Sequence, residues 1–466
     1  MHEAVEGLFV QGALAEVWDH CRQENIELAL VGGAVRDRLL GTPTKDLDLV
    51  VERDAFALAK RFADQLGATF VPLDPEREIA RLALKDGTWL DFALLVGDRL
   101  EDDLANRDFT INAMAIHPDR GLVDPLGGAA DLEEGRLRLC GPDTLVNDPL
   151  RCLRAIRMLA RYPFEPAEGL LDEVRRAVPW LSRVSRERVR DELFFILEAG
   201  VSRVLDAMEY TNLLLWLFPE LEDCQGCEQN HFHHLDVLDH TLLVVRHLEA
   251  LSSEGLELRV GEHLARRLVP NRSRFALLKF CAFLHDLGKP ATRSVGHSGR
   301  IHFRGHDLVG AEMAAQVAER FMLSRQEIRY VEKLVRLHLK PVVMPARGAD
   351  DRQLHRFFRE AGEMAPDLLV HSRADVLATR GPAQSDWLLE SHRLFMELML
   401  DDFFAQGPLS APPMPLTGDD LLGLGLKPGS WIGALLAQLR EDAVEHDLSD
   451  RETALAWARR LAEKLL

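Results

Sequence analysis

Cysteine is scarce in this chain, with six residues in 466. So few cysteines do not make a disulfide framework and fit a reducing compartment. The lone pair Cys224 and Cys227 is interpreted as incidental. No apolar run is long enough to span a bilayer, and the first 21 residues lack the basic start and cleavage site of a signal peptide. We therefore expect a cytoplasmic protein with no membrane partner.

Positive charge is in deficit, with 56 Lys and Arg against 75 Asp and Glu and a formal net charge of −19. This balance argues against a strongly basic, nonspecific nucleic-acid binder. It still allows a local basic face, and residues 150–161, 183–190 and 266–274 are arginine-rich candidates. An ordinary solvated helix face is the alternative for each stretch, and for the third it is the better interpretation.

Residues 26 to about 140 alternate β-rich runs with helical patterns, which predicts a mixed sheet with helices, an α+β fold. Ala55 to Leu66 has helical periodicity and ends at Gly67, a common helix stop. Asp86-Gly87 is a typical hairpin dipeptide. The predicted strands are residues 26–31, 47–52, 68–73, 78–85 and 88–96.

From about Asp148 onward, strands nearly vanish and long amphipathic helical patterns dominate. Composition changes at residues 222–229, before a histidine-rich region, and at the proline-rich linker 406–415. No internal repeat is visible. The expected division is residues 1–140, 141–222, 223–405 and 406–466.

The segment 30–51 carries the strongest chemical signal. It is typical of a buried strand, two glycines, a helix start with Arg36, a turn and a second strand. On that second strand, Asp46 and Asp48 are two residues apart, so their side chains point the same way and suit a hard cation such as Mg2+. The glycines let the backbone approach a phosphate, which indicates nucleotide chemistry. These glycines are Gly32 and Gly33.

Asp91 is a further candidate for this carboxylate group. It lies on the predicted strand 88–96 between apolar neighbours. Either it faces solvent at a sheet edge, or it joins Asp46 and Asp48 as a third carboxylate. The residues alone leave both alternatives open.

Two later segments offer groups that would bind a nucleotide. Residues 106–115 (NRDFTINAMA) have a helical pattern in which Asp108 and Asn112 share a face and could bind ribose hydroxyls, while Arg107 could contact a triphosphate. Residues 148–157 (DPLRCLRAIR) place three arginines along one helix face, which suits phosphate or a base edge better than a core. These are Arg151, Arg154 and Arg157.

Five motifs now occur in one order over residues 30–193: GGAVRD, KDLD, RDFTINAMA, DPLRCLRAIR and SRERVRDEL. They resemble the class II tRNA nucleotidyltransferase and bacterial poly(A) polymerase family. The resemblance implies a polymerase-β-like nucleotidyltransferase head, an all-α neck, a further helical domain and a helical tail. It also implies that the substrate is the 3′ end of a tRNA.

The resemblance assigns roles to the candidate residues. Asp46 and Asp48, with Asp91 as a third catalytic candidate, would hold two Mg2+ ions that activate the tRNA 3′-hydroxyl and neutralise the triphosphate. Asp148 and Arg151 match the family's templating pair, which hydrogen-bonds the Watson–Crick edge of C or A. The other residues expected to bind the nucleotide are Gly32, Gly33, Arg36, Arg107, Asp108, Asn112, Arg154 and Arg157.

Arg188 and Glu192 match the helix that props the neck in this family. An ordinary i,i+4 ion pair between them is compatible with that role. Two positions depart from the family pattern. Asn147 stands where an acid usually precedes the templating aspartate, and Asn106 stands where the family usually has the first of two arginines.

A larger departure is a shortening at residues 94–106 (LLVGDRLEDDLAN), which are acidic and compact. Full CCA-adding enzymes have a long, basic, flexible loop there, associated with the switch from C to A addition. Its absence resembles the CC-adding members, which leave the final A to a partner enzyme. A neutral deletion is the alternative, because loops tolerate length change. We expect addition of CC from CTP, with full CCA addition from CTP and ATP as the alternative.

A second group of residues lies between positions 230 and 375. Its order, H…HD…H…H…D, resembles the HD phosphohydrolase superfamily, whose domain follows the head in some bacterial tRNA nucleotidyltransferases. A lone histidine on an apolar helix is usually just packed, but six His and Asp residues with an adjacent His-Asp doublet indicate a metal site. They are His240, His285, Asp286, His306, His338 and Asp375.

The HD resemblance implies a ligand set. His306 and His338 would complete a second metal site, with Asp286 bridging. Such ligands suit Mn, Ni, Co, Fe or Zn without deciding among them. A metal-bound hydroxide would attack a phosphoester, with Lys289 steadying the anion; a helical bundle that only holds the tRNA is the alternative. The first metal would be held by His240, His285, Asp286 and Asp375.

Two other functions compete with tRNA end addition. A poly(A) polymerase shares the head motifs, but such polymerases commonly carry basic C-terminal extensions and no HD segment. A protein that is mainly an HD-type phosphodiesterase or phosphatase would not need the intact KDLD and DPLR motifs. The expected partners are tRNA, CTP and a separate A-adding enzyme. If the enzyme adds the full CCA sequence, ATP is a further substrate. The sequence does not give the oligomeric state.

Overall fold

The computed structural model describes the chain in two compact units, each considered by itself. Unit 1 comprises Met1–Ala199 and Asp206–Trp216, and unit 2 comprises Gly200–Leu205 and Leu217–Leu466. The division into four parts stays a prediction. The described residues within these bounds are 12–230, 233–253, 258–347, 351–379, 385–406, 415–424, 429–443, 446, 448 and 450–465.

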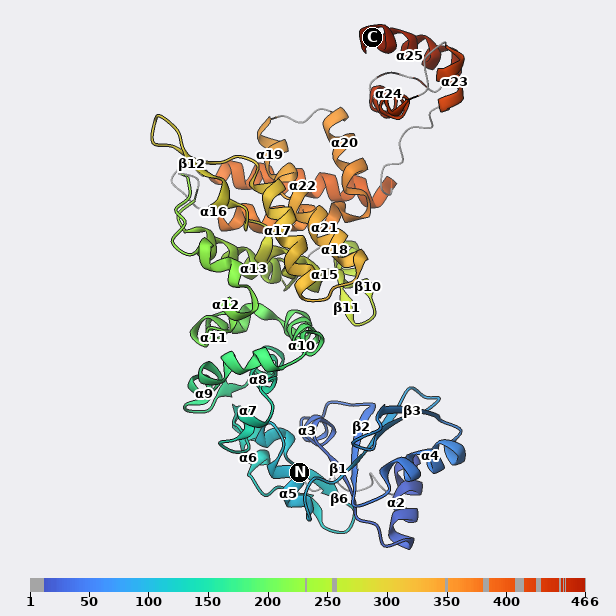
Figure 1. Ribbon diagram of the computed structural model, residues 1–466, viewed down its shortest axis with the longest axis vertical. Helices are drawn as coiled ribbons and strands as arrows, with labels where there is room; N and C mark the ends of the chain where they lie inside the picture. Colours follow the sequence, from blue (N-terminus) through green and yellow to red (C-terminus); the bar gives the residue numbers. More distant parts are fainter. Residues whose placement is uncertain are drawn as a thin grey trace. The chain divides into compact units, whose positions relative to one another are not determined.

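Unit 1 contains a seven-stranded sheet in the order β3-β4-β5-β2-β1-β6-β7 (Figure 1). In this sheet β2 and β5 are parallel, and the other neighbouring pairs are antiparallel. The five strands predicted from the sequence are confirmed. Gly87 (φ 82°) lies in the turn that connects β4 to β5. The strands are β1 (Leu28–Val31), β2 (Asp46–Val51), β3 (Thr69–Asp74), β4 (Ile79–Ala83), β5 (Trp89–Leu94), β6 (Ala115–His117) and β7 (Gly121–Val123).

Helices accompany the sheet and follow it along the chain, as an α+β fold requires. A short parallel pair, β8 (Arg136–Leu137) with β9 (Glu165–Pro166), lies among them. The helices are α2 (Ala13–Gln23), α3 (Gly33–Leu39), α4 (Ala55–Leu66), α5 (Leu100–Ala105), α6 (Gly128–Glu133), α7 (Thr144–Asn147), α8 (Arg151–Arg161), α9 (Leu170–Ala177), α10 (Arg186–Ala199), α11 (Leu205–Tyr210) and α12 (Leu213–Leu217).

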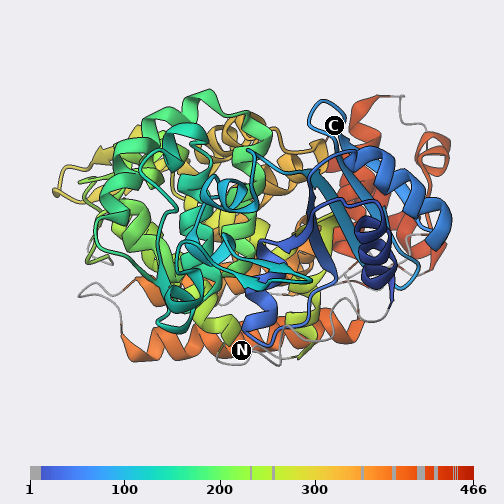
Figure 2. The same cartoon turned by 90° about the horizontal axis from the view of Figure 1, so that it is seen from below.

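Helices α2 and α4 cover one face of the sheet, and Figures 1 and 2 show both on the same side of it. Phe62 of α4 stacks on Phe92 of β5, with 6.3 Å between the ring centroids. His20 of α2 contacts Phe62 at 5.6 Å. Successive side chains of a strand point to opposite faces, so Asp91 points away from α4. Apolar side chains of the sheet pack against α4 on one face, and polar side chains such as Asp91 lie on the other face.

The prediction of a helix at residues 106–115 is wrong. The chain forms a 3-10 turn at Thr110–Asn112 and then continues as β6, which pairs with β1. Asp108 Oδ1 accepts hydrogen bonds from the amide of Phe109 at 2.8 Å and from Asn112 Nδ2 at 3.0 Å. Short polar side chains that bond the nearby backbone compete with helix formation. Asp108 and Asn112 still meet, as the prediction required.

Unit 2 is helical, with two short hairpins made by β10 (Arg267–Val269) with β11 (Arg272–Ser273) and β12 (Arg293–Val295) with β13 (Ile301–Phe303). No described helix of the chain is both long and apolar enough to cross a bilayer. Residues 407–414 of the expected linker lie outside the described residues. The helices are α13 (Val237–Ser253), α14 (Leu258–Ala265), α15 (Arg274–Leu284), α16 (Lys289–Thr292), α17 (His306–Arg320), α18 (Arg325–Leu337), α19 (Leu339–Arg347), α20 (Asp351–Ala361), α21 (Ala365–Ala378), α22 (Asp386–Gln406), α23 (Gly418–Gly423), α24 (Ser430–Asp442) and α25 (Arg451–Leu465).

A buried carboxylate ties the core of unit 2 together. Asp367 of α21 accepts hydrogen bonds from His263 Nε2 at 2.9 Å, Arg274 Nη2 at 2.7 Å and the Tyr330 hydroxyl at 2.7 Å. Burial alone would raise the pKa of Asp367, but the bonds from His263 and Arg274 hold that pKa below its usual value. One side chain thus links α14, α15, α18 and α21.

Replacing Asp367 with Asn should lower the free energy of unfolding of unit 2 by about 3 kcal/mol, because breaking a buried ion pair leaves Arg274 uncompensated. Denaturant unfolding followed by circular dichroism measures the loss. The matched control is Asp401→Asn, which breaks the exposed pair with Arg259 at 3.4 Å and should cost under about 1 kcal/mol. Equal effects of the two substitutions would contradict the structural role of Asp367.

Candidate functional site

The register between β2 and β5 brings three carboxylates of unit 1 together. Asp48 lies beside Asp91 in this parallel pair, so both point to the face opposite α4. Arg81 of β4 binds Asp91 through Nε at 2.8 Å and Nη2 at 2.7 Å, and it reaches Asp46 Oδ1 at 3.4 Å. Asp91 therefore joins Asp46 and Asp48. Its catalytic role stays a prediction, since Arg81 holds its carboxylate.

Burial and neighbouring carboxylates raise the pKa of Asp46 and of Asp48. Burial first, and then the charges of Asp46 and Asp91, raise the pKa of Asp48 to about 6. Burial also raises the pKa of Asp46, against the opposing charge of Arg81. A divalent cation between the carboxylates would offset this repulsion, and an all-oxygen donor set is what Mg2+ prefers. The residues therefore fit the expected ion.

Gly32, between β1 and α3, is a point of close approach. Its φ of 73° lies in the left-handed region that favours glycine. A Cβ atom there would lie 2.9 Å from Arg107 Nη1 and 3.4 Å from Asp48 Oδ2. Any other side chain would therefore push apart an arginine and a carboxylate that face the same space.

A cavity of about 400 Å3 opens beside Gly32. All its lining residues are ones that the sequence singled out, and Asp91 lies outside this lining. They come from the turn after β1, from β2, from residues 107–112 and from the start of α8, so distant segments meet as expected. Their roles in binding stay predictions. The lining residues are Gly32, Gly33, Arg36, Asp46, Asp48, Arg107, Asp108, Asn112, Asp148, Arg151, Arg154 and Arg157.

Most arginines of the cavity are oriented by a partner side chain. Arg154 Nη2 lies 2.7 Å from Asp108 Oδ2, and Arg107 Nη2 lies 2.9 Å from Asp103 Oδ2. Burial alone would raise the pKa of Asp108, but the charge of Arg154 holds that pKa below its usual value. Arg36 Nη1 donates to Asn112 Oδ1 at 2.5 Å. Fixed guanidinium groups present their remaining N–H donors in a set direction.

The two α10 residues of the family pattern do not pair with each other, so the simple i,i+4 ion pair is wrong. Arg188 Nη2 lies 2.8 Å from Asp148 Oδ2. Glu192 Oε1 accepts a hydrogen bond from Arg157 Nη1 at 3.0 Å. Helix α10 therefore supports two side chains that line the cavity.

The shortened interval at residues 94–106 is ordered. It contains α5, whose buried Asp103 accepts a hydrogen bond from the amide of Val96 at 3.1 Å and binds Arg107 through its other oxygen. Gly97, with φ of 98°, makes the turn before α5. The interval is thus a compact connection that orients a cavity arginine.

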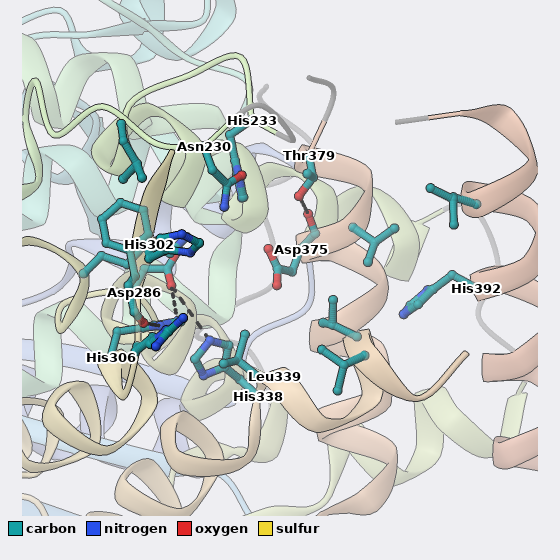
Figure 3. A pocket seen from close by; sticks show the side chains of 18 of the residues that line it. Asn230, His233, Asp286, His302, His306, His338, Leu339, Asp375, Thr379 and His392 are labelled. Atoms are coloured by element: carbon teal, nitrogen blue, oxygen red, sulfur yellow. Dashed lines mark hydrogen bonds and ion pairs between the residues drawn. The ribbon is translucent and has the colours of Figure 1, made fainter. Parts of the chain in front are cut away.

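Unit 2 brings its six predicted ligands to one place, and Figure 3 labels four of them around one cavity. All six are buried. His285 directly follows the last residue of α15, and His338 directly follows that of α18. His306 begins α17. His240 lies on α13, and Asp375 on α21.

Asp286 lies at the centre of this group. Its Oδ2 is 3.1 Å from His285 Nε2 and 3.8 Å from His240 Nε2. Its Oδ1 is 3.4 Å from His306 Nε2 and 3.8 Å from His338 Nε2. Two sets of potential ligands therefore share one carboxylate, which is the geometry of the predicted bridge. Asp375 Oδ1 lies 3.0 Å from His240 Nε2.

Three of these histidines share one hydrogen-bond pattern. The Nδ1 atoms of His285, His306 and His338 lie 2.8, 2.7 and 2.5 Å from backbone carbonyl oxygens three positions earlier. A carbonyl only accepts, so Nδ1 carries a hydrogen, and in the neutral ring Nε2 keeps its lone pair. Lone pairs aimed at a carboxylate repel it unless a cation lies between them. The residues therefore fit a metal ion.

Sequence reasoning missed two further histidines beside this group. His371 is fully buried, and its ring centroid lies 5.0 Å from that of His285. It stands four residues before Asp375 on α21, and that i,i+4 spacing was the available signal. The ring of His233 lies 5.0 Å from that of His240, in an irregular segment that gave no signal.

Lys289 also lies where the sequence placed it. Its Nζ is 2.5 Å from Asp286 Oδ2, and it donates to Gln229 Oε1 at 2.6 Å. Its role toward an anion stays a prediction. Cys224 and Cys227 are free thiols, and their interpretation as an incidental pair stays a prediction.

Three family models match the chain. The poly A polymerase head domain matches residues 28–138, the probable RNA and SrmB-binding site of polymerase A matches residues 163–225, and the HD domain matches residues 237–380. The first and third matches include the carboxylates of unit 1 and the histidines of unit 2. The resemblance drawn from the motifs is therefore confirmed.

Individual proteins match over nearly the whole chain. The A-adding tRNA nucleotidyltransferase of Deinococcus radiodurans is 37% identical over 94% of this chain and 96% of its own length. The CC-adding tRNA nucleotidyltransferase of Thermus thermophilus is 34% identical over 92% of each chain. A solved complex of a CCA-adding enzyme with CTP has a TM-score of 0.69 at 23% identity, covering 99% of this chain and 98% of that one, and shares the fold. The chain belongs to the tRNA nucleotidyltransferase family.

Proposed function

We propose that this enzyme adds cytidines from CTP to the 3′ end of a tRNA and stops at CC. The observation that carries the proposal is the compact connection at residues 94–106, where Asp103 binds both the backbone of Val96 and Arg107. A long basic loop has no place in that connection. The likeness to the CC-adding enzyme of Thermus thermophilus supports the proposal. The final A would come from a separate A-adding enzyme.

The cavity of unit 1 offers the groups for this transfer. Mg2+ ions held by Asp46 and Asp48 would supply charge neutralisation and a lowered pKa for the tRNA 3′-hydroxyl. Arg36, Arg107 and Arg154 would donate N–H groups to phosphate oxygens. Because their partner side chains orient them, these donors need little rearrangement when a nucleotide binds.

Asp148 and Arg151 would select the base. A carboxylate accepts from the 4-amino group of cytosine, whereas uracil places a carbonyl there and would be repelled. Arg151 would donate to the neighbouring ring acceptors, and its Nη2 is anchored by the carbonyl of Asn106 at 2.8 Å. Adenine also presents an amino group beside a ring nitrogen. The pair would therefore accept cytosine and adenine and reject uracil. Another part of the protein must determine after which nucleotide addition stops, and we propose that residues 94–106 do so.

A-addition is the second candidate, because the A-adding relative is 37% identical over nearly the whole chain. Purified protein with Mg2+ would be given tRNAs ending before CCA, after C and after CC, with CTP, ATP or both. The expected products stop at CC, and the CC-ended tRNA refuses ATP. Product length at single-nucleotide resolution is the measurement.

Three other outcomes would contradict CC addition. Extension of only the CC-ended tRNA, and only by ATP, would identify an A-adding enzyme. Extension of all three tRNAs to CCA would show that residues 94–106 do not set the end of addition. Long A tails would indicate a poly(A) polymerase.

Replacing Arg188 with Ala should loosen Asp148, whose Oδ2 it binds at 2.8 Å. Since the pair is half exposed, the expected effect is about a fivefold loss in kcat/KM for CTP relative to UTP. Single-nucleotide addition kinetics measure this ratio. The exposed Arg186 of the same helix supplies the control, R186A, which should leave the ratio unchanged. Equal losses for CTP and UTP in R188A would mean that Arg188 only stabilises the fold.

We further propose that unit 2 hydrolyses phosphoesters with the aid of divalent transition metals. Asp286 and the lone pairs of His285, His306 and His338 support metal binding. The bound metal would supply a hydroxide nucleophile. Lys289, at 2.5 Å from Asp286, would steady the anionic phosphate. Mn, Ni, Co, Fe and Zn all suit this donor set.

Substitutions at the two sites should separate the two activities. Asp46→Ala with Asp48→Ala should abolish nucleotide addition and spare hydrolysis of 2′,3′-cyclic nucleotides, because the sites use separate residues. His285→Ala with Asp286→Ala should do the reverse and lower the metal content measured by mass spectrometry. Loss of hydrolysis in the first variant would rule out two independent sites.

A further inference from the structure

Tyr162 directly follows the last residue of α8 and contacts two neighbouring residues of α3. Its hydroxyl donates a hydrogen bond to Asp37 Oδ1 at 3.1 Å. The guanidinium carbon of Arg36 lies 4.8 Å from the centroid of its ring, which is a cation–π contact. Phe164 stacks on the same ring with 5.1 Å between centroids, and this limits the rotation of the ring. The end of α8 is thereby joined to an arginine that lines the cavity of unit 1.

The two residues of α3 that Tyr162 contacts also pair with each other. Asp37 Oδ1 accepts hydrogen bonds from Arg36 Nε at 2.9 Å and from Arg36 Nη2 at 2.7 Å. Consecutive side chains of a helix diverge and do not normally face each other. Here a third group contacts both of them, because the ring of Tyr162 lies against Arg36 while its hydroxyl binds the same oxygen of Asp37. The unusual pair therefore depends on a residue from outside α3.

The orientation of Arg36 decides what its guanidinium offers to a ligand. The side chain is buried and lines the cavity. Nε and Nη2 donate to Asp37, and Nη1 donates to Asn112 Oδ1 at 2.5 Å. Each Nη atom carries a second N–H group, and such a fork suits the oxygens of a phosphate. Rotation of the side chain would turn these donors away, so the groups that hold the guanidinium influence how well it binds phosphate.

We propose that Tyr162 is a positioning residue of the transfer reaction. Through its ring and through Asp37, it holds Arg36 in the orientation that meets the triphosphate of the incoming nucleotide. Helix α8 then acts on the nucleotide from both ends, because its first residue, Arg151, lines the cavity and the residue after its last one holds Arg36. This inference rests on the proposed contact between Arg36 and the triphosphate, and it applies to CTP and to ATP alike.

Affinity for nucleotides with different numbers of phosphates tests the proposal. Isothermal titration calorimetry with Mg2+ measures the binding of CTP and of CMP to the full-length protein and to its variants Tyr162→Leu and Tyr162→Phe. The matched control is Tyr210→Leu. The hydroxyl of Tyr210 lies 2.5 Å from Asp172 Oδ1, and Arg175 lies over its ring at 5.6 Å. This exposed tyrosine thus makes the same kinds of contact, and it lies outside the cavity lining.

Y162L should weaken the binding of CTP about fivefold, the effect typical of losing a cation–π contact together with a hydrogen bond. CMP lacks two of the three phosphates, so its binding should weaken less. Y162F keeps the ring and should weaken CTP only about twofold, and Y210L should bind both nucleotides like the parent protein. Equal weakening of CTP and CMP by Y162L, or weakening of neither, would overturn the proposal.

A double-mutant cycle separates this inference from the contact on which it rests. In the Arg36→Gln protein, adding Tyr162→Leu should cost no further affinity for CTP, because Tyr162 acts through Arg36. An equal loss in both backgrounds would overturn the proposal. If R36Q itself binds CTP like the parent protein, the proposed contact of Arg36 fails, and the inference fails with it. If R36Q loses affinity for CTP and Y162L does not, the positioning role fails alone. ATP and AMP replace CTP and CMP if the protein adds only A.

Discussion

A carboxylate that leaves water must find compensating charge or hydrogen bonds, and both units are organised by that requirement. In unit 1, Asp108 is held by Arg154 and Asn112. In unit 2, Asp367 is held by donors from three helices. Asp286 differs from both, because four histidine nitrogens lie around it beside Lys289, whose Nζ is 2.5 Å from Oδ2. Where protein donors alone surround a carboxylate, it holds helices or side chains in place; where imidazole nitrogens gather around it, it fits a cation.

In unit 1, a set of ion pairs and hydrogen bonds connects helices α8 and α10 to the side chains that line the cavity. Glu192 of α10 holds Arg157 of α8, Arg188 of α10 holds Asp148, and Arg154 holds Asp108. Each contact fixes a side chain that would otherwise sample several rotamers. A nucleotide that enters such a cavity meets donors already in place, so less of its binding free energy is spent on ordering them.

Five strands of the sheet and the Asp46–Asp48 pair could be predicted because each depends on local period or on residue type at a fixed spacing. The grouping of the six His and Asp residues of unit 2 followed from the resemblance of their order to the HD superfamily. Prediction failed at residues 106–115, where the hydrogen bonds that Asp108 accepts from the Phe109 amide and from Asn112 outweigh a helical pattern. It left Asp91 open, because only the pairing of β2 with β5 places that side chain.

The positions of His285 and His338 at the ends of α15 and α18 have a consequence for the backbone. The aligned peptide dipoles of a helix leave partial negative charge at its C-terminal end. Two such ends meet at Asp286, and the N-terminal end of α17, which begins at His306, adds partial positive charge beside them. The potential around Asp286 is therefore partly a property of helix direction and not of side chains alone. A descendant chain that exchanged one histidine would keep that part, so the backbone contribution to the site would outlast a change in its side chains.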